Sequence, residues 1–204
     1  MNGKAPNLNP ASTRKTVWII LAASLTAFLA QFLYYSHVYS ETNRPPQAGY
    51  DLVLMYTGEI SLTSAADIAL AGHAPLFISG GINPIKSVAD AQKLLGNLPV
   101  VYNPHAQTTD QNARESSDFI RQKHFHQVLL VTGWGQLPRA LLLTRYYLIG
   151  SGVKILSTAD HPAPKNWWRS RQAWLQFFKL WGSLGRVVLH WVGVDHWPAP
   201  EWMP

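Results

Sequence analysis

The sequence predicts an α/β protein with a Rossmann-like, doubly wound and mainly parallel sheet, an N-terminal transmembrane helix and a C-terminal amphipathic helix. The sheet is predicted from short apolar runs that alternate with helical patterns over residues 50–160. Such alternation is typical of a parallel sheet covered by helices on both faces. We expect strands at 51–56, 75–79, 99–102, 127–132 and 153–156, and helices between them at about 63–72, 86–96, 109–123 and 138–149.

The N-terminal helix is predicted from Thr16–Tyr35, which contains no charged residue. About 20 such residues cross the ~30 Å hydrocarbon core of a bilayer as a helix. Lys4, Arg14 and Lys15 precede this segment, so the positive-inside rule places the N-terminus in the cytoplasm. A cleaved signal peptide is the alternative, but the apolar run is longer than usual and no clear small-x-small site follows it. We expect a cytoplasmic leader at 1–15, a single-pass inner-membrane anchor at 16–36, a linker at 37–49 and a periplasmic α/β domain at 50–160.

Residues 161–204 form a Trp-rich tail that holds most of the nine tryptophans of the chain. Its segment 173–192 is strongly apolar, but Lys179 and Arg186 would each cost roughly 2.5–3.5 kcal/mol near the centre of a membrane span. An amphipathic helix therefore fits better than a second span. Two placements stay open for it, docked on the α/β domain or lying in the bilayer interface with tryptophan as anchor. Its polar stripe consists of Gln176, Lys179, Ser183, Arg186 and His190.

Composition and charge exclude several classes of protein. The chain has 204 residues, is 47% hydrophobic and 14% charged, and contains no cysteine. These values exclude intrinsic disorder, a disulfide scaffold, a cysteine-based zinc site and a thiol nucleophile. A formal net charge of +6 raises the question of nucleic-acid binding. Three of the 17 basic residues precede the apolar segment and five lie among the tail tryptophans, however, so we expect a lipid bilayer as partner and no nucleic acid.

Candidate site residues follow the predicted strands, because ligands of open parallel sheets bind beyond the carboxyl ends of the strands. The loops there are rich in Gly, Ser, Thr and Asn, which suits an anion such as phosphate, although tight turns use the same residues. Arg139 lies in the first turn of a predicted helix, where a cation opposes the helix dipole, so it either holds an anion or is a solvated surface residue. Glu59 and His105 are candidate acids or bases, and no metal site is expected. The candidate ligand-binding residues are Thr57, Gly58, Ser79, Gly80, Gly81, Thr108, Thr109, Asn112, Thr132 and Arg139.

One helix start can be predicted in detail. The sequence from Thr108 to Gln111 fits a capping box, with Thr108 as the N-cap residue. Asn112 then lies one turn into the helix and points back toward the same loops.

Four segments together resemble the bacterial YdcF/SanA/ElyC family, in the right order and spacing over about residues 50–160. They are Asp51–Gly58 (DLVLMYTG), Phe77–Gly81 (FISGG), Thr108–Ala113 (TTDQNA) and Val128–Ala140 (VLLVTGWGQLPRA). The apolar N-terminal segment and the Trp-rich tail look like the membrane-anchored branch of that family. The resemblance implies a Rossmann-like domain that often faces the periplasm, with links to envelope integrity, peptidoglycan assembly and lipid-carrier metabolism. One cytoplasmic relative is associated with binding S-adenosylmethionine.

Two positions depart from the family pattern. The family usually has His where this chain has Gln136, and it usually has an Arg within the stretch that is Ile60–Thr63 here. Glutamine does not titrate, so Gln136 can only hydrogen-bond at a position where the family's His could act as an acid or base. The candidate catalytic residues are Glu59, the only carboxylate on the predicted rim, and Gln136, which occupies the position of the family's His. Gly80, Gly81, Thr109, Asn112, Thr132 and Arg139 all fall on the family pattern.

These observations favour an envelope-biogenesis protein whose periplasmic domain binds or processes a phosphorylated, lipid-carrier-like ligand. The alternatives are an enzyme or binder for a nucleotide or S-adenosylmethionine-like molecule, and a non-catalytic envelope scaffold. The sequence leaves open whether the protein is an enzyme and which cofactor, if any, it uses.

Overall fold

A five-stranded parallel sheet forms the centre of the protein in a computed structural model that describes residues 10–42, 49–58, 60–81 and 87–191. The strand order is β3-β2-β1-β4-β5, and every neighbouring pair is parallel. The prediction of a parallel α/β sheet is therefore confirmed. The strands are β1 (Leu52–Tyr56), β2 (Leu76–Ser79), β3 (Val100–Asn103), β4 (Gln127–Thr132) and β5 (Lys154–Ala159).

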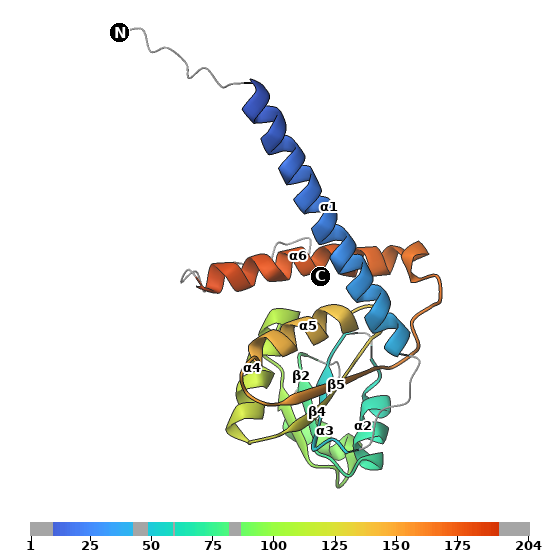
Figure 1. Cartoon of the computed structure of the whole chain (residues 1–204). Coiled ribbons are helices and arrows are strands. Elements are labelled where there is room, and N and C mark those ends of the chain that lie inside the picture. The colour runs from blue at the N-terminus through green and yellow to red at the C-terminus, as the bar shows by residue number, and fades with distance from the viewer. Residues whose placement is uncertain (1–9, 43–48, 59, 82–86, 192–204) are drawn as a thin grey trace. The chain divides into compact units, whose positions relative to one another are not determined.

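Four helices connect the strands and cover the two faces of the sheet (Figure 1). The first two contact strands β1, β2 and β3, and the last two lie together on the opposite face. The strand order switches from one side of β1 to the other between β1 and β4, and ligands of such sheets bind outside the carboxyl ends of the strands at that point. The helices are α2 (Leu62–Ala71), α3 (Val88–Leu95), α4 (Thr109–Gln122) and α5 (Leu137–Tyr147).

Strand β1 lies in the core, and all five of its residues are buried. Val53 and Met55 pack in one hydrophobic cluster with residues of α2 and α3. Tyr56 instead bonds to the helices of the other face, with its hydroxyl 2.8 Å from Ser116 Oγ of α4 and 2.8 Å from Thr144 Oγ1 of α5. Burial raises the pKa of Tyr56 far above its ordinary value, so the phenol stays neutral.

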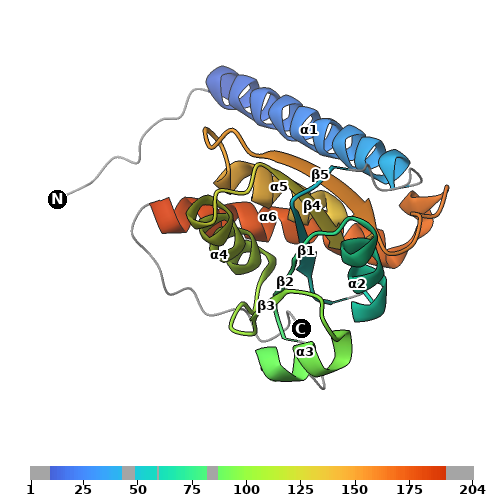
Figure 2. The same cartoon turned by 90° about the horizontal axis from the view of Figure 1, so that it is seen from below.

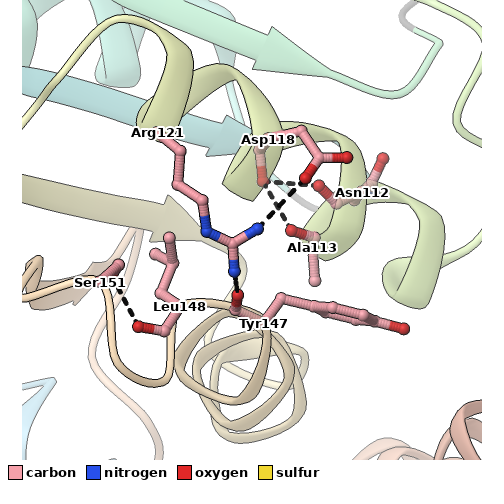
Figure 3. A network of polar contacts seen from close by, with 8 residues as sticks. Asn112, Ala113, Asp118, Arg121, Tyr147, Leu148 and Ser151 are labelled. Atoms are coloured by element: carbon pink, nitrogen blue, oxygen red, sulfur yellow. Dashed lines mark hydrogen bonds and ion pairs between the residues drawn. The ribbon is translucent and has the colours of Figure 1, made fainter.

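A second polar contact joins α4 to α5 near their carboxyl ends (Figure 3). The Arg121 guanidinium forms an ion pair with Asp118 at 3.2 Å and also donates a hydrogen bond to the Tyr147 carbonyl. These contacts help to fix the two helices side by side. The N-terminal turns of α4 and α5 lie at the other end of this pair, where they follow the carboxyl ends of β3 and β4.

The Trp-rich tail contains a short 3-10 helix, η1 (Trp167–Arg169), and the long helix α6 (Arg171–Trp191). Helix α6 contacts α4 and α5, as Figure 2 also shows. The predicted amphipathic helix is therefore present, and one side of it docks on the α/β domain. Gln176 and Ser183 of the predicted polar stripe are buried, so the stripe faces the domain.

The chain divides into two compact units, Met1–His37 and Val38–Pro204. Helix α1 (Pro10–Glu41) fills the described part of the first unit and ends inside the second, so the predicted linker begins as helix. Its segment Lys15–Glu41 is long and apolar enough to cross a membrane. No other helix in the described part of the chain meets that criterion.

Candidate functional site

A cavity of about 410 Å³ lies beyond the carboxyl edge of the sheet. The loops that follow β1, β2, β3 and β4 all contribute to its wall, and α4, α5 and α6 complete it. The described lining residues are Thr57, Gly58, Gly81, Pro104, Ala106, Gln107, Thr108, Thr109, Asn112, Gln136, Arg139, Gln176, Lys179 and Arg186.

Two glycines allow neighbouring loops to pack closely at the rim of this cavity. Gly80 has a φ of +100°, and a Cβ atom built on it would lie 2.1 Å from Thr57 Oγ1. Gly58 has a φ of +143°, and its Cβ atom would lie 2.5 Å from Gln136 Nε2. Residues with a Cβ atom rarely adopt such φ values, and both of these distances are shorter than the Cβ contacts found in real proteins. These glycines therefore let Thr57 and Gln136 approach the backbone of neighbouring loops.

The first turn of α4 is held firmly at the cavity. Thr108 is the N-cap residue, as predicted, and its Oγ1 accepts a hydrogen bond from the Gln111 N–H at 3.2 Å. The returning bond of the predicted capping box differs by one residue, because Gln111 Oε1 accepts from the Gln107 N–H at 2.9 Å. Asn112 is buried one turn later, and its Oδ1 accepts from Ser79 Oγ at 2.9 Å.

Three cationic side chains converge on the same cavity. Arg139 comes from the first turn of α5, while Lys179 and Arg186 come from α6. All three are partly exposed, so each can reach a ligand while keeping some contact with water. Among the lining residues that the structure describes, none carries a carboxylate. The described lining of the cavity therefore carries a net positive charge.

Most of the residues predicted from the sequence lie around this one cavity. Gly80 follows β2 next to Gly81 and touches Thr57, but Ser79 and Thr132 are fully buried. The Ser79 hydroxyl positions Asn112, and the Thr132 hydroxyl donates to the Tyr56 carbonyl at 3.2 Å. The predicted residues that line the cavity are Thr57, Gly58, Gly81, Thr108, Thr109, Asn112, Gln136 and Arg139.

Of the two candidate acids or bases, His105 is among the described residues and Glu59 is not. Glu59 lies outside the described residues, so its predicted role stays a prediction. His105 is exposed and is not among the described residues that line the cavity. Gln136, the other candidate catalytic residue, lines the cavity as an uncharged hydrogen-bonding group.

The sequence did not predict that α6 contributes to the site. Gln176, Lys179 and Arg186 were recognised as one polar stripe of an amphipathic helix, yet nothing in the pattern says which surface that stripe meets. The structure places all three at the cavity, with Gln176 Oε1 and Arg139 Nε both buried. The signal in the sequence is the pair of cations, Lys179 and Arg186, within the polar stripe of that helix.

No family model matches the chain, and searches of curated proteins and of solved structures also give no match. The resemblance to the YdcF/SanA/ElyC family therefore stays a prediction from the quoted segments.

Proposed function

We propose that this protein is a membrane-anchored binding protein of the bacterial cell envelope, and that its cavity takes a phosphorylated, lipid-carrier-like ligand. The observation that carries the proposal is the convergence of Arg139, Lys179 and Arg186 on one cavity with the capped first turn of α4. The resemblance to the YdcF/SanA/ElyC family supports the envelope setting.

The donors around the cavity match the chemistry of a phosphate group. An arginine guanidinium can donate two parallel hydrogen bonds to phosphate oxygens, and a lysine ammonium adds a point charge. Thr57, Thr108 and Thr109 add hydroxyl groups, and the N-terminus of α4 adds partial positive charge. The cavity volume of about 410 Å³ lies within the ~300–1,000 Å³ of small-molecule sites.

The described lining residues suit the binding of a ligand better than they suit acid–base catalysis. An acid or base that works near neutral pH is normally His, Asp or Glu, and the described lining residues include none of these. Gln136 can orient a ligand but cannot exchange a proton with it. Processing of the ligand would therefore depend on Glu59 or on a group from elsewhere.

The proposed location is the bacterial inner membrane, with the N-terminus in the cytoplasm and the α/β domain in the periplasm. The apolar helix Lys15–Glu41 supports a single-pass anchor. The basic residues Lys4, Arg14 and Lys15 before the apolar segment support the orientation.

The positive charge of the cavity also bears on the alternative ligands. S-adenosylmethionine carries a cationic sulfonium, which three nearby cations would repel. A nucleotide carries the same phosphate chemistry as a phosphorylated lipid, so only a direct comparison separates the two.

The test is a titration of the full-length chain in detergent micelles with farnesyl phosphate, farnesol, ADP and S-adenosylmethionine. We expect saturable binding of farnesyl phosphate that is tighter than that of the other three. Arg139→Gln should weaken it roughly 10- to 100-fold, because a hydrogen bond to a charged group contributes ~1.5–3 kcal/mol. Arg145→Gln, an exposed residue at the other end of the same helix, is the matched control and should leave the Kd unchanged.

Three results would overturn the proposal. Equal binding of farnesol would show that the phosphate is not recognised. Tighter binding of ADP would favour the nucleotide alternative. Equal binding by Arg139→Gln and the wild-type chain, with both equally folded, would remove Arg139 from the site.

A further inference from the structure

Helix α6 has an apolar stripe on the side that faces away from the domain. Its buried side contains Ala173, Gln176, Phe177, Leu180, Ser183 and Val187. On the other side, the exposed fractions are 51% for Leu175, 59% for Phe178, 49% for Trp181 and 62% for Val188. Four large apolar side chains on one exposed helix face form a patch of the kind that marks an interaction surface. We call these four residues the outer stripe.

A series of aromatic rings joins the outer stripe to the end of α1. The Tyr39 ring lies 5.0 Å from that of Trp167 and 5.5 Å from that of Trp134. The ring centroid of Trp167 lies in turn 6.4 Å from that of Trp174. The Trp174 ring stacks on that of Phe178 in the outer stripe, with 5.9 Å between the ring centroids. A hydrogen bond from the Ala163 N–H to Thr42 Oγ1, 3.0 Å long, adds to the same connection. The start of α6 is therefore fixed next to the residues with which α1 ends.

The length of α1 sets the depth at which that connection would lie in a membrane. At about 1.5 Å of rise per residue, the 27 residues of Lys15–Glu41 extend roughly 40 Å. A bilayer with its headgroup regions is ~40–45 Å thick. If α1 crosses the bilayer, Tyr39 reaches the headgroup level, and the beginning of α6 is held there with it.

The charges near the outer stripe suit an anionic lipid surface. Lys165, Arg169 and Arg171 are exposed, and they lie just before α6 or at its first residue. Tryptophan rings interleaved with basic side chains are typical of helices that lie in the interface of anionic bilayers.

We propose that α6 is an interfacial helix whose outer stripe rests on an anionic lipid bilayer while its other side forms a wall of the charged cavity. The proposal rests on the membrane anchor of the proposed function. It deepens that function, because a cavity at headgroup level would receive the phosphate of an amphiphilic ligand while the apolar chain of that ligand stays in the bilayer.

The test uses the absence of cysteine in the chain, because any introduced cysteine gives a unique label. The full-length chain is reconstituted in nanodiscs of phosphatidylethanolamine and phosphatidylglycerol, with a spin label at Phe178→Cys or Trp181→Cys. Label accessibility to oxygen and to a water-soluble nickel chelate is measured by electron paramagnetic resonance. Ile149→Cys, 74% exposed and located between α5 and β5, is the matched aqueous control, and Leu25→Cys in α1 is the membrane control.

We expect the ratio of oxygen to nickel accessibility at Phe178→Cys and Trp181→Cys to be several-fold higher than at Ile149→Cys. Aqueous values at both outer-stripe positions, with a lipid value at Leu25→Cys, would overturn the proposal and leave the anchor standing. An aqueous value at Leu25→Cys would overturn the anchor and this proposal with it. Dipolar broadening at Phe178→Cys that disappears on dilution with unlabelled chain would assign the outer stripe to a second copy of the protein, which also overturns the proposal.

Discussion

Replacing Gly80 by alanine tests the rim geometry that brings Thr57 close to the loop after β2. The positive φ of +100° alone should cost ~1–2 kcal/mol for a residue with a Cβ atom. The new methyl group would also lie 2.1 Å from Thr57 Oγ1, and such overpacking typically costs ~1–3 kcal/mol. The alanine recovers about 0.4–1 kcal/mol, because it restricts the unfolded chain.

The sum of these contributions is a loss of about 1–4.6 kcal/mol in the free energy of unfolding. For a domain of this size, that corresponds to a Tm lower by roughly 2–18 °C. The assay is thermal unfolding of the full-length chain in detergent, followed by near-ultraviolet circular dichroism. Most of the aromatic residues that give this signal lie outside α1, whereas the 32 residues of that helix contribute strongly to the far-ultraviolet signal.

Gly81→Ala is the matched control at the neighbouring position. Among the described residues, leaving out its chain neighbours, no heavy atom lies within 4 Å of a Cβ built on Gly81, and its φ is outside the left-handed region. We expect its free energy of unfolding to change by less than about 0.5 kcal/mol. Equal Tm values for the two variants would refute the reasoning about the rim, because the structure assigns the strain to Gly80 alone of this pair.

Other predictions concern the core and the start of α4. The unfolding free energy should fall as the pH rises above 10.0, the ordinary pKa of tyrosine, since the unfolded chain then releases a proton that the buried Tyr56 phenol retains. Tyr56→Phe should flatten this slope in urea unfolding measured at several pH values, and an unchanged slope would contradict the assignment. Thr108→Ala removes the cap of α4 and should cost ~0.5–2 kcal/mol in the same assay, whereas Thr63→Ala on α2 should cost less. Farnesyl phosphate should bind more weakly as the salt concentration rises, because the three cations of the cavity are partly exposed to screening, and a salt-independent Kd would contradict a site built on charge.

Most of the sheet could be predicted because its strands are short apolar runs between helical patterns. Strand β1 is buried along its whole length and is almost wholly apolar, so its position follows from hydrophobicity. Strand β5 continues to Ala159, beyond the predicted end at residue 156. Ser157 and Thr158, just before that end, carry no apolar signal and are strand because they pair with Leu130 and Val131 of β4.

The candidate site could be predicted in part for a related reason. Loops at the carboxyl ends of parallel strands must meet at one edge, so Thr57, Gly81 and Asn112 can be grouped from the sequence alone. Helix α6 could not be added to that group, since an amphipathic pattern defines two faces but not the partner of either. Ser79 lies where predicted along the chain, but its hydroxyl turns inward to Asn112, a choice that depends on tertiary packing.

An experimental structure of the full-length chain with pyrophosphate tests the central claim most directly. The account predicts that a phosphoryl oxygen lies about 3 Å from the Arg139 guanidinium, at the first turn of α4, with Lys179 or Arg186 on the other side. Pyrophosphate bound elsewhere, or a cavity that stays without it at saturating concentration, would contradict the account.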